Sequence, residues 1–192
     1  MVPSLPAGDR QIRTIGFDDA PHTRDAKTVS VAGVVCSGAR FEGMVWGMAA
    51  KDGWDATAVL GGMLSGSKYA SQVHAVLVDG IAVGGLNVVD LPELAARLAV
   101  PCIAVMRRQP DLEGMKRAVL RLPYPERRLA VLARAGQIHA EPPFFFQVHG
   151  APPEYASEVL RRSTDTGHVP EPLRLAHLIG SAVIDGESRG RA

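Results

Sequence analysis

VHAVLVDG, residues 73–80, is the stretch that decides the fold. Five of its eight residues are Val, Leu or Ala, and no charge interrupts the run before Asp79. Such a run is typical of a strand that is buried on both faces, in a sheet covered by helices. Asp79 stands where the strand ends, and Gly80 allows the chain to turn there. In α/β proteins this is a common place for a functional carboxylate, although an Asp at a strand end also serves to cap a turn.

The composition is that of a globular protein with a sizeable core. Of the 192 residues, 46% are hydrophobic and 21% are charged. This length predicts a single domain over residues 11–192, preceded by a loose, flexible tail over residues 1–10. The net charge of +1 gives no overall sign of nucleic-acid or membrane binding. Any basic surface therefore has to be local.

The two cysteines, Cys36 and Cys102, lie in apolar runs and belong to no CxxC pair. We interpret them as small buried residues in a reducing compartment, not as a disulfide or a zinc site. The chain has no apolar run of signal-peptide or membrane-span length. We therefore expect a cytoplasmic protein without a membrane partner, and the sequence leaves its oligomeric state open.

Hydrophobic patterning indicates three strands at the start of the chain and a regular alternation afterwards. Residues 28–36 and 41–50 are Val-rich strands joined by SGAR, a spacing typical of a β-hairpin. The predicted strands cover residues 11–17, 28–36, 41–50, 73–79, 101–106 and 144–148. The predicted helices cover residues 56–64, 91–98, 112–120, 126–135 and 154–162, and residues 170–179 open a final helix. This order predicts an α/β fold of the ribonuclease-H-like kind, in which a mixed sheet of antiparallel hairpin strands and then parallel strands carries helices on both faces.

Acidic residues follow three of the predicted strands. Asp18 and Asp19 end the first strand, Asp55 follows the third, and Asp79 ends the fourth. Only one of two neighbouring strand residues faces a given side, so either Asp18 or Asp19 points toward a shared site. Clustered carboxylates hold Mg²⁺ together with water and substrate phosphates, and such a site can hydrolyse a phosphodiester. Alternatively, each acid caps its own turn or helix, as Asp55 is placed to do for the following helix.

Two further side chains have both a functional and an ordinary interpretation. Arg107 and Arg108 end a predicted strand and could hold a phosphate or lie in solvent. His177 lies on an apolar helix face, where it could be a ligand or a satisfied core histidine. Sequence motifs for nucleotide binding, for zinc proteases and for a nucleophilic serine are absent.

The chain resembles the domain of unknown function family ninety-nine, an endonuclease-V-like group. The resemblance covers nearly all of the chain. It rests on GFDDAP at 16–21, DGWDAT at 52–57, LVDGIAVGGLNVVDL at 77–91, VPEPLRLAHLIGSA at 169–182 and the final GESRGRA.

A more distant resemblance is to endonuclease V itself, a Mg²⁺-dependent nuclease that cuts near deaminated purines. It implies that Asp18, Asp55 and Asp79 are catalytic and hold Mg²⁺ or Mn²⁺. It also places His177 at the metal and Arg107 where the family has a catalytic lysine. Asp55 stands where the family has a glutamate, and the family's PYIPG wedge has no match between Ser37 and Asp55.

Two hypotheses follow from these residues. The first is a divalent-metal-dependent nuclease that acts on RNA or DNA, with Asp18, Asp55, Asp79, Arg107 and His177 at its site. The second is a non-catalytic module that keeps the nuclease fold and binds nucleic acid or assembles with protein, since folds outlive their chemistry.

Overall fold

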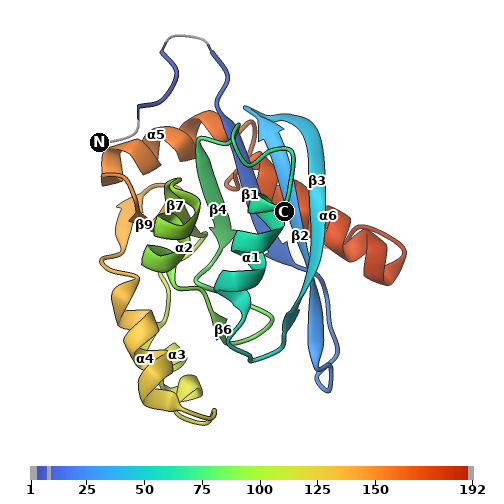
Figure 1. Ribbon diagram of the computed structural model, residues 1–192, viewed down its shortest axis with the longest axis vertical. Helices are drawn as coiled ribbons and strands as arrows, with labels where there is room; N and C mark the ends of the chain where they lie inside the picture. Colours follow the sequence, from blue (N-terminus) through green and yellow to red (C-terminus); the bar gives the residue numbers. More distant parts are fainter. Residues whose placement is uncertain (1–3, 8–9, 190–192) are drawn as a thin grey trace.

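The computed structural model describes residues 4–7 and 10–189. Its main feature is one large sheet with helices packed on both sides (Figure 1). None of the helices in these residues is long and apolar enough to cross a membrane. The strands are β1 Arg13–Asp19, β2 Thr28–Ser37, β3 Arg40–Ala50, β4 Ala75–Asp79, β5 Ala82–Val83, β6 Asn87–Val88, β7 Cys102–Met106, β8 His139–Glu141 and β9 Phe144–His149, and the helices are α1 Ala56–Ser65, α2 Leu91–Leu98, α3 Leu112–Val119, α4 Pro125–Arg134, α5 Pro153–Ser163 and α6 Glu171–Asp185.

The seven strands of the large sheet lie in the order β3-β2-β1-β4-β7-β9-β8. β1, β4 and β7 run parallel to one another, and β1, β2 and β3 pair antiparallel. The predicted hairpin is confirmed, because Ser37 pairs with Arg40 across a tight turn. Gly38 occupies that turn with φ +58°, a conformation that favours glycine.

The far side of the sheet differs from the predicted order. β9 pairs antiparallel with β7, and β8, which the sequence analysis did not predict, pairs antiparallel with β9. The sheet therefore has antiparallel strands on both sides of a parallel centre. β8 has only three residues, two of them exposed, so it carries no hydrophobic alternation that could have marked it as a strand.

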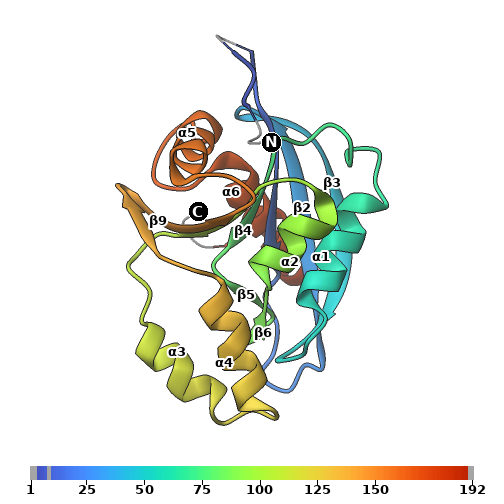
Figure 2. The same ribbon diagram turned by 60° about the vertical axis from the view of Figure 1, so that its left-hand side comes forward.

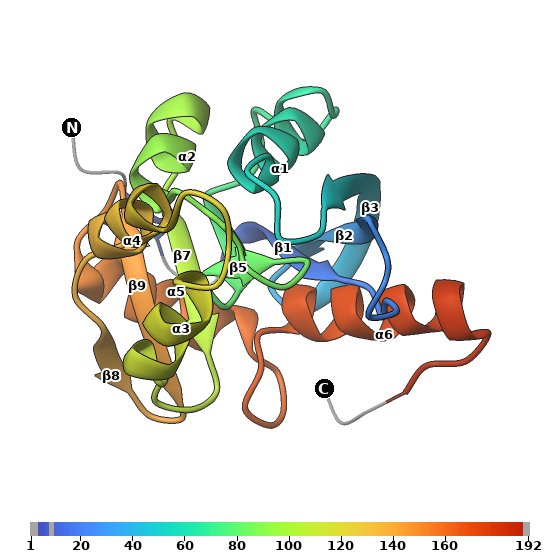
Figure 3. The ribbon, with the colours of Figure 1, turned by 90° about the horizontal axis from the view of Figure 1, so that it is seen from below.

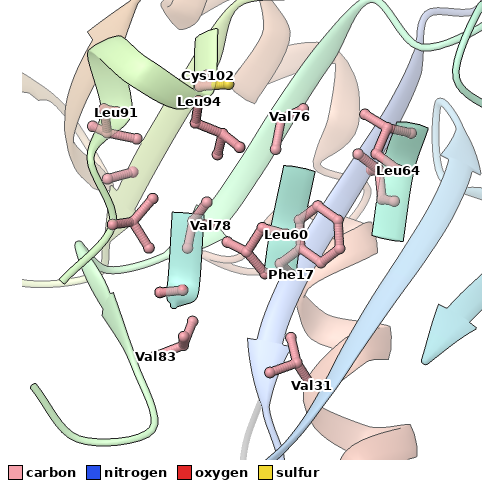
Figure 4. Packing of buried hydrophobic residues seen from close by; sticks show 14 of the residues in the cluster. Phe17, Val31, Leu60, Leu64, Val76, Val78, Val83, Leu91, Leu94 and Cys102 are labelled. Carbon is pink, nitrogen blue, oxygen red and sulfur yellow. The ribbon is translucent and has the colours of Figure 1, made fainter. Parts of the chain in front are cut away.

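Alternate residues of the central strand β4 pack against different helices. Val76 and Val78 join the cluster under α1 and α2, which includes Leu60 and Leu94 (Figure 4). Leu77 belongs to a second cluster on the opposite face, under α5. Because both faces are covered, β4 is an uninterrupted apolar run that ends at a half-buried Asp79.

Helix α6 lies along β1 on the face opposite α1 and α2 (Figure 3). Its first turn packs directly on the strand backbone at Gly16, where an added Cβ would stand 2.7 Å from the Leu173 nitrogen. Four residues along a helix advance about 6 Å, close to the advance of two residues along a strand. Leu173 lies over Gly16, and His177 consequently lies over Asp18.

The short β5–β6 hairpin and the helices α3 and α4 extend beyond the lower end of the sheet (Figure 2). This is the end where β1, β4 and β7 finish. The predicted loose tail at residues 1–10 lies partly outside the described residues, at 1–3 and 8–9. Of the remainder, Leu5 packs against the cluster under α5.

Candidate metal and phosphodiester site

Asp18 and Asp79 emerge side by side at the carboxyl end of the parallel strands. The register pairs Phe17 of β1 with Val78 of β4, so the next residues on the two strands are Asp18 and Asp79. Phe17 and Val78 belong to the cluster under α1 and α2, which places both acids on the opposite, α6 side. Adjacent strands are only about 4.8 Å apart, a separation that one cation can bridge.

The register also decides between Asp18 and Asp19. Asp19 follows the alternation to the other face, and His22 Nδ1 lies 3.5 Å from its Oδ2. The pKa of Asp19 is raised because the group is buried, while a hydrogen bond from the backbone of Gly84 opposes the shift. Asp18 is therefore the residue that shares a face with Asp79.

His177 is the third member of this group. Its Nδ1 lies 3.0 Å from Asp18 Oδ2, a hydrogen bond between side chains that are 159 positions apart in the sequence. The Asp18 side chain is 10% exposed and that of His177 is 34% exposed. The imidazole therefore separates a nearly buried carboxylate from solvent and fixes the direction of one of its oxygens.

Arg107 completes the group from the end of β7. Its Nη2 lies 3.8 Å from Asp79 Oδ2, and both side chains are partly exposed. The two residues share an open cavity of about 710 Å³. The cavity is lined by Asp79, Gly80, Val105, Met106, Arg107, Arg108, Pro143 and His168.

Burial and repulsion both act on the two carboxyl groups. Burial raises the pKa of Asp18 to about 7, and the negative charges of Asp79 and Asp19 add to the shift, while the hydrogen bond with His177 opposes it. Burial also raises the pKa of Asp79, against the stabilising charges of Arg107 and His177. A cation between these carboxylates would offset the repulsion between their negative charges.

Asp55, the third predicted acid, makes its hydrogen bonds with residues other than Asp18 and Asp79. Asp55 precedes α1, and its Oδ1 accepts hydrogen bonds from Asn87 Nδ2 at 2.6 Å and from the Ala50 nitrogen at 3.0 Å. These contacts connect the end of β3 to the β5–β6 hairpin. Asp55 stands at the N-cap position of α1, but its side chain makes no capping hydrogen bond. Its position after a predicted strand suggested a metal ligand. The hydrogen-bond partner Asn87 lies 32 residues away in the sequence, so this contact could not be inferred.

The carboxylate oxygens of Asp18 and Asp79 are suitable donors for a hard divalent cation such as Mg²⁺. Among the residues that the structure describes, no three His, Cys, Asp or Glu side chains form a group that could hold a metal ion by themselves. Mg²⁺ commonly uses only one or two carboxylates and takes its other oxygens from water and substrate phosphates. Asp18 and Asp79 supply that number. Burial raises the pKa of each, so a bound cation would favour their ionised forms.

His168 and Pro143 line the cavity, and the sequence analysis did not identify them. His168 belongs to the loop between α5 and α6, and Pro143 precedes β9. Neither stands in a motif or at the carboxyl end of a predicted strand. Only the antiparallel placement of β9 beside β7 brings Pro143 to the cavity.

The mixed sheet, with its helices on both faces, has the fold of endonuclease V. The catalytic domain of human endonuclease V superposes with a TM-score of 0.59 at 15% identity, covering 94% of this chain and 87% of that one. Endonuclease V of Ciona intestinalis, in complex with an inosine-containing DNA, gives a TM-score of 0.55 at 15% identity, covering 88% and 83%.

The chain belongs to the Endonuclease dU family, whose model matches residues 10–184. A UPF0215 protein of Methanothermobacter thermautotrophicus is 40% identical over 188 residues, covering 95% of this chain and 92% of the relative. A crystal structure of an Archaeoglobus fulgidus protein of unknown function has a TM-score of 0.86 at 34% identity, covering 91% and 99%. The predicted likeness to endonuclease V is thus confirmed at the level of the fold.

Proposed function

We propose that this protein is a divalent-metal-dependent endonuclease that hydrolyses phosphodiester bonds in DNA or RNA. The observation that carries the proposal is the placement of Asp18 and Asp79 at adjacent strand ends, on one face. The family name and the fold of endonuclease V support the same class of activity.

Asp18 and Asp79 would hold Mg²⁺ or Mn²⁺, with His177 at the edge of the ion. When bound, the ion activates water and stabilises the leaving oxygen of the phosphodiester. His177 holds Asp18 in one orientation through the 3.0 Å contact. Arg107 lies beside Asp79 at the cavity, where a guanidinium can form paired hydrogen bonds with a phosphate.

The substrate is a nucleic acid, and the family name together with the Ciona endonuclease V complex suggests which lesions to test. The family name contains dU, the usual abbreviation of deoxyuridine, and the Ciona endonuclease V was crystallised with inosine-containing DNA. We also propose that the protein works in the cytoplasm. The two cysteines are buried and unpaired, as suits a reducing compartment.

Cleavage assays with labelled oligonucleotides test the proposal. Single- and double-stranded substrates containing deoxyuridine, inosine or neither are incubated with Mg²⁺, Mn²⁺ or a chelator. We expect cleavage only with metal, and we expect Asp79→Asn to abolish it without unfolding the protein. Asp19→Asn is the matched control, because Asp19 is adjacent to Asp18 but faces the other side, and it should retain cleavage. Failure to cut any substrate with either metal would refute the proposal.

A non-catalytic nucleic-acid-binding or protein-assembly module is the second candidate. The observation that favours it is Arg107, which already places a positive charge next to Asp79. The lack of a PYIPG wedge also supports it. Titration with Mn²⁺ discriminates the two candidates. A vestigial site should show the same weak Mn²⁺ binding in the wild type and in Asp79→Ala, whereas a nuclease should lose affinity in the variant.

A further inference from the structure

A second cavity lies on the other side of the sheet, where α1, α2 and α4 meet. Its volume is about 720 Å³, and Asp18, Asp79 and their neighbours take no part in it. Two aromatic side chains at its border are unusually exposed, since Trp54 is 44% and Tyr124 is 64% accessible. We call this cavity the aromatic site. It is lined by Trp54, Thr57, Ala58, Val88, Asp90, Glu93, Tyr124, Arg127, Ala130, Val131 and Arg134.

A buried arginine supports the Trp54 ring, and the Tyr124 ring lies next to Trp54. Arg128 is 2% exposed, and its guanidinium carbon lies 4.2 Å from the centroid of the Trp54 ring. The same guanidinium donates to the carbonyl oxygens of Asp52 and Gly53, which immediately precede Trp54. The Tyr124 ring stands 6.4 Å from the Trp54 ring at an angle of 59°. Exposed aromatic rings that are fixed in this way are prepared for stacking, because little side-chain entropy remains to be lost.

Tyr124 also has an unfavourable backbone conformation. Its φ is +57°, in the left-handed region, at the N-cap position of α4. Asn or Gly is much better suited than a bulky side chain to both conditions. A tyrosine at this position destabilises the fold, and its ring is largely exposed to solvent. This points to a role in binding, because nothing in the packing of α4 requires an exposed aromatic ring.

The chain segment that carries α3 and α4 is basic, and at the aromatic site its Arg127 and Arg134 lie beside two acids, Asp90 and Glu93. Residues 107–134 contain eight basic and three acidic residues, in a chain whose net charge is only +1. Arg127 lies over the Trp54 ring at 5.4 Å, and Arg134 pairs with Asp90. Glu93 is the other acid at the site. Aromatic rings surrounded by arginines, with a carboxylate that can accept hydrogen bonds, suit the face and the edge of a nucleobase joined to phosphate.

The basic segment connects the two cavities. It begins with Arg107 and Arg108, which line the cavity next to Asp79, and it ends with Arg134 at the aromatic site. Figures 2 and 3 show α3 and α4 at the end of the sheet where β4 and β7 finish. The basic segment therefore contributes residues to both cavities.

We propose that the aromatic site binds an unpaired base of single-stranded nucleic acid, with Arg127 contacting the adjacent phosphate. The proposal rests on the proposed function for the identity of the ligand, but it concerns binding and not cleavage. It assigns to Trp54 and Tyr124 the stacking of a base that flanks the bond to be cut.

Tryptophan fluorescence reports binding directly, because the chain has only two tryptophans. In a Trp46→Phe background, Trp54 is the sole emitter, and the probe is a single-stranded thymidine oligonucleotide with a chelator present. We expect saturable quenching that is stronger than with a blunt duplex of the same length. Trp54 touches Arg128, so its removal could disturb folding, and the test therefore uses Tyr124→Asn, which suits the backbone and removes the ring.

Tyr124→Asn should weaken oligonucleotide binding about tenfold while thermal stability is kept or raised. Arg127→Ala should flatten the dependence of log affinity on log salt by roughly 0.7. Arg161→Ala, an exposed arginine on α5, is the matched control and should change neither quantity. Unchanged affinity in both Tyr124→Asn and Arg127→Ala, or the absence of quenching, would overturn the inference. Quenching that persists in a protein without nuclease activity would refute only the proposed function.

Discussion

Asp18 Oδ2 and His177 Nδ1 lie 3.0 Å apart, and this contact joins the end of the first strand to the last helix. The two residues meet because four residues of α6 span nearly the same length as two residues of β1. The same contact opposes, without cancelling, the rise in the pKa of Asp18 that burial and Asp79 produce. Four predictions follow from this geometry and from the contacts around it.

The stability of the metal-free protein should fall as the pH rises from about 4 to about 7. In that window the folded state keeps a proton on Asp18, whose pKa is about 7, and the unfolded state has already released it. Stability contributed by protonation is therefore complete at low pH and is lost as pH passes the folded pKa. The loss should be on the order of 2–4 kcal/mol in denaturant titrations. Asp18→Asn should flatten the dependence of stability on pH. An equally steep dependence in that variant would contradict the assignment of this titration to Asp18.

Gly16→Ala should destabilise the protein by roughly 1–3 kcal/mol, because the new Cβ would meet backbone atoms of α6. The nearest of these atoms, Leu173 nitrogen and Pro172 carbonyl carbon, would both be 2.7 Å away. The displaced helix should also carry His177 away from Asp18 and lower metal affinity. Gly62→Ala is the control, since a Cβ there meets nothing within 4 Å and alanine favours the α1 helix. Calorimetry of both variants distinguishes a local clash from a general effect of alanine.

Asn87→Ala should destabilise the protein by about 1–3 kcal/mol because it leaves buried polar groups without partners. Asn87 is fully buried, donates to Asp55 Oδ1 and the Ala50 oxygen, and accepts from the Ala56 nitrogen. A double-mutant cycle with Asp55→Ala should show coupling between the two side chains. Mn²⁺ affinity should be unchanged in Asp55→Ala, whereas a large loss would restore Asp55 as a ligand.

Arg128→Lys should loosen α3 and α4 although it preserves the charge. An ammonium cannot replace a planar guanidinium that donates to several carbonyl oxygens in different directions. Hydrogen exchange should accelerate in α3 and α4 before the rest of the sheet. Arg127→Lys, at the neighbouring exposed position, should leave exchange unchanged.

The hairpin, the central strand and the helices were predictable because their signals are local. SGAR closes β2 and β3, and the apolar run before Asp79 forms β4 as predicted. The sequence predicted that Asp18 and Asp79 lie close together only on the condition that the sheet is ribonuclease-H-like. The alternation along β1 left Asp18 and Asp19 equivalent until the register with β4 was known.

The contacts that the sequence analysis did not identify at the site have a common physical cause. Asp55 has the right residue type after the right strand, but Asn87 engages it from a distant hairpin. Pro143 and His168 reach the cavity only through the placement of β9 and of the loop before α6. Tertiary contacts of this kind leave no period and no motif in the sequence. His177 was identified through the family resemblance, since a histidine on an apolar helix is not distinctive alone.

The four hydrogen bonds of the buried Arg128 side chain all end on main-chain oxygens, those of Asp52, Gly53, Leu86 and Pro123. A main-chain oxygen is present whatever side chain its residue carries. These four hydrogen bonds therefore depend on the path of the backbone and not on the side chains of the acceptor residues. All of the chemical constraint falls on Arg128, the single donor residue. One side chain thus fastens α4 to the loop that carries Trp54 and to the β5–β6 hairpin.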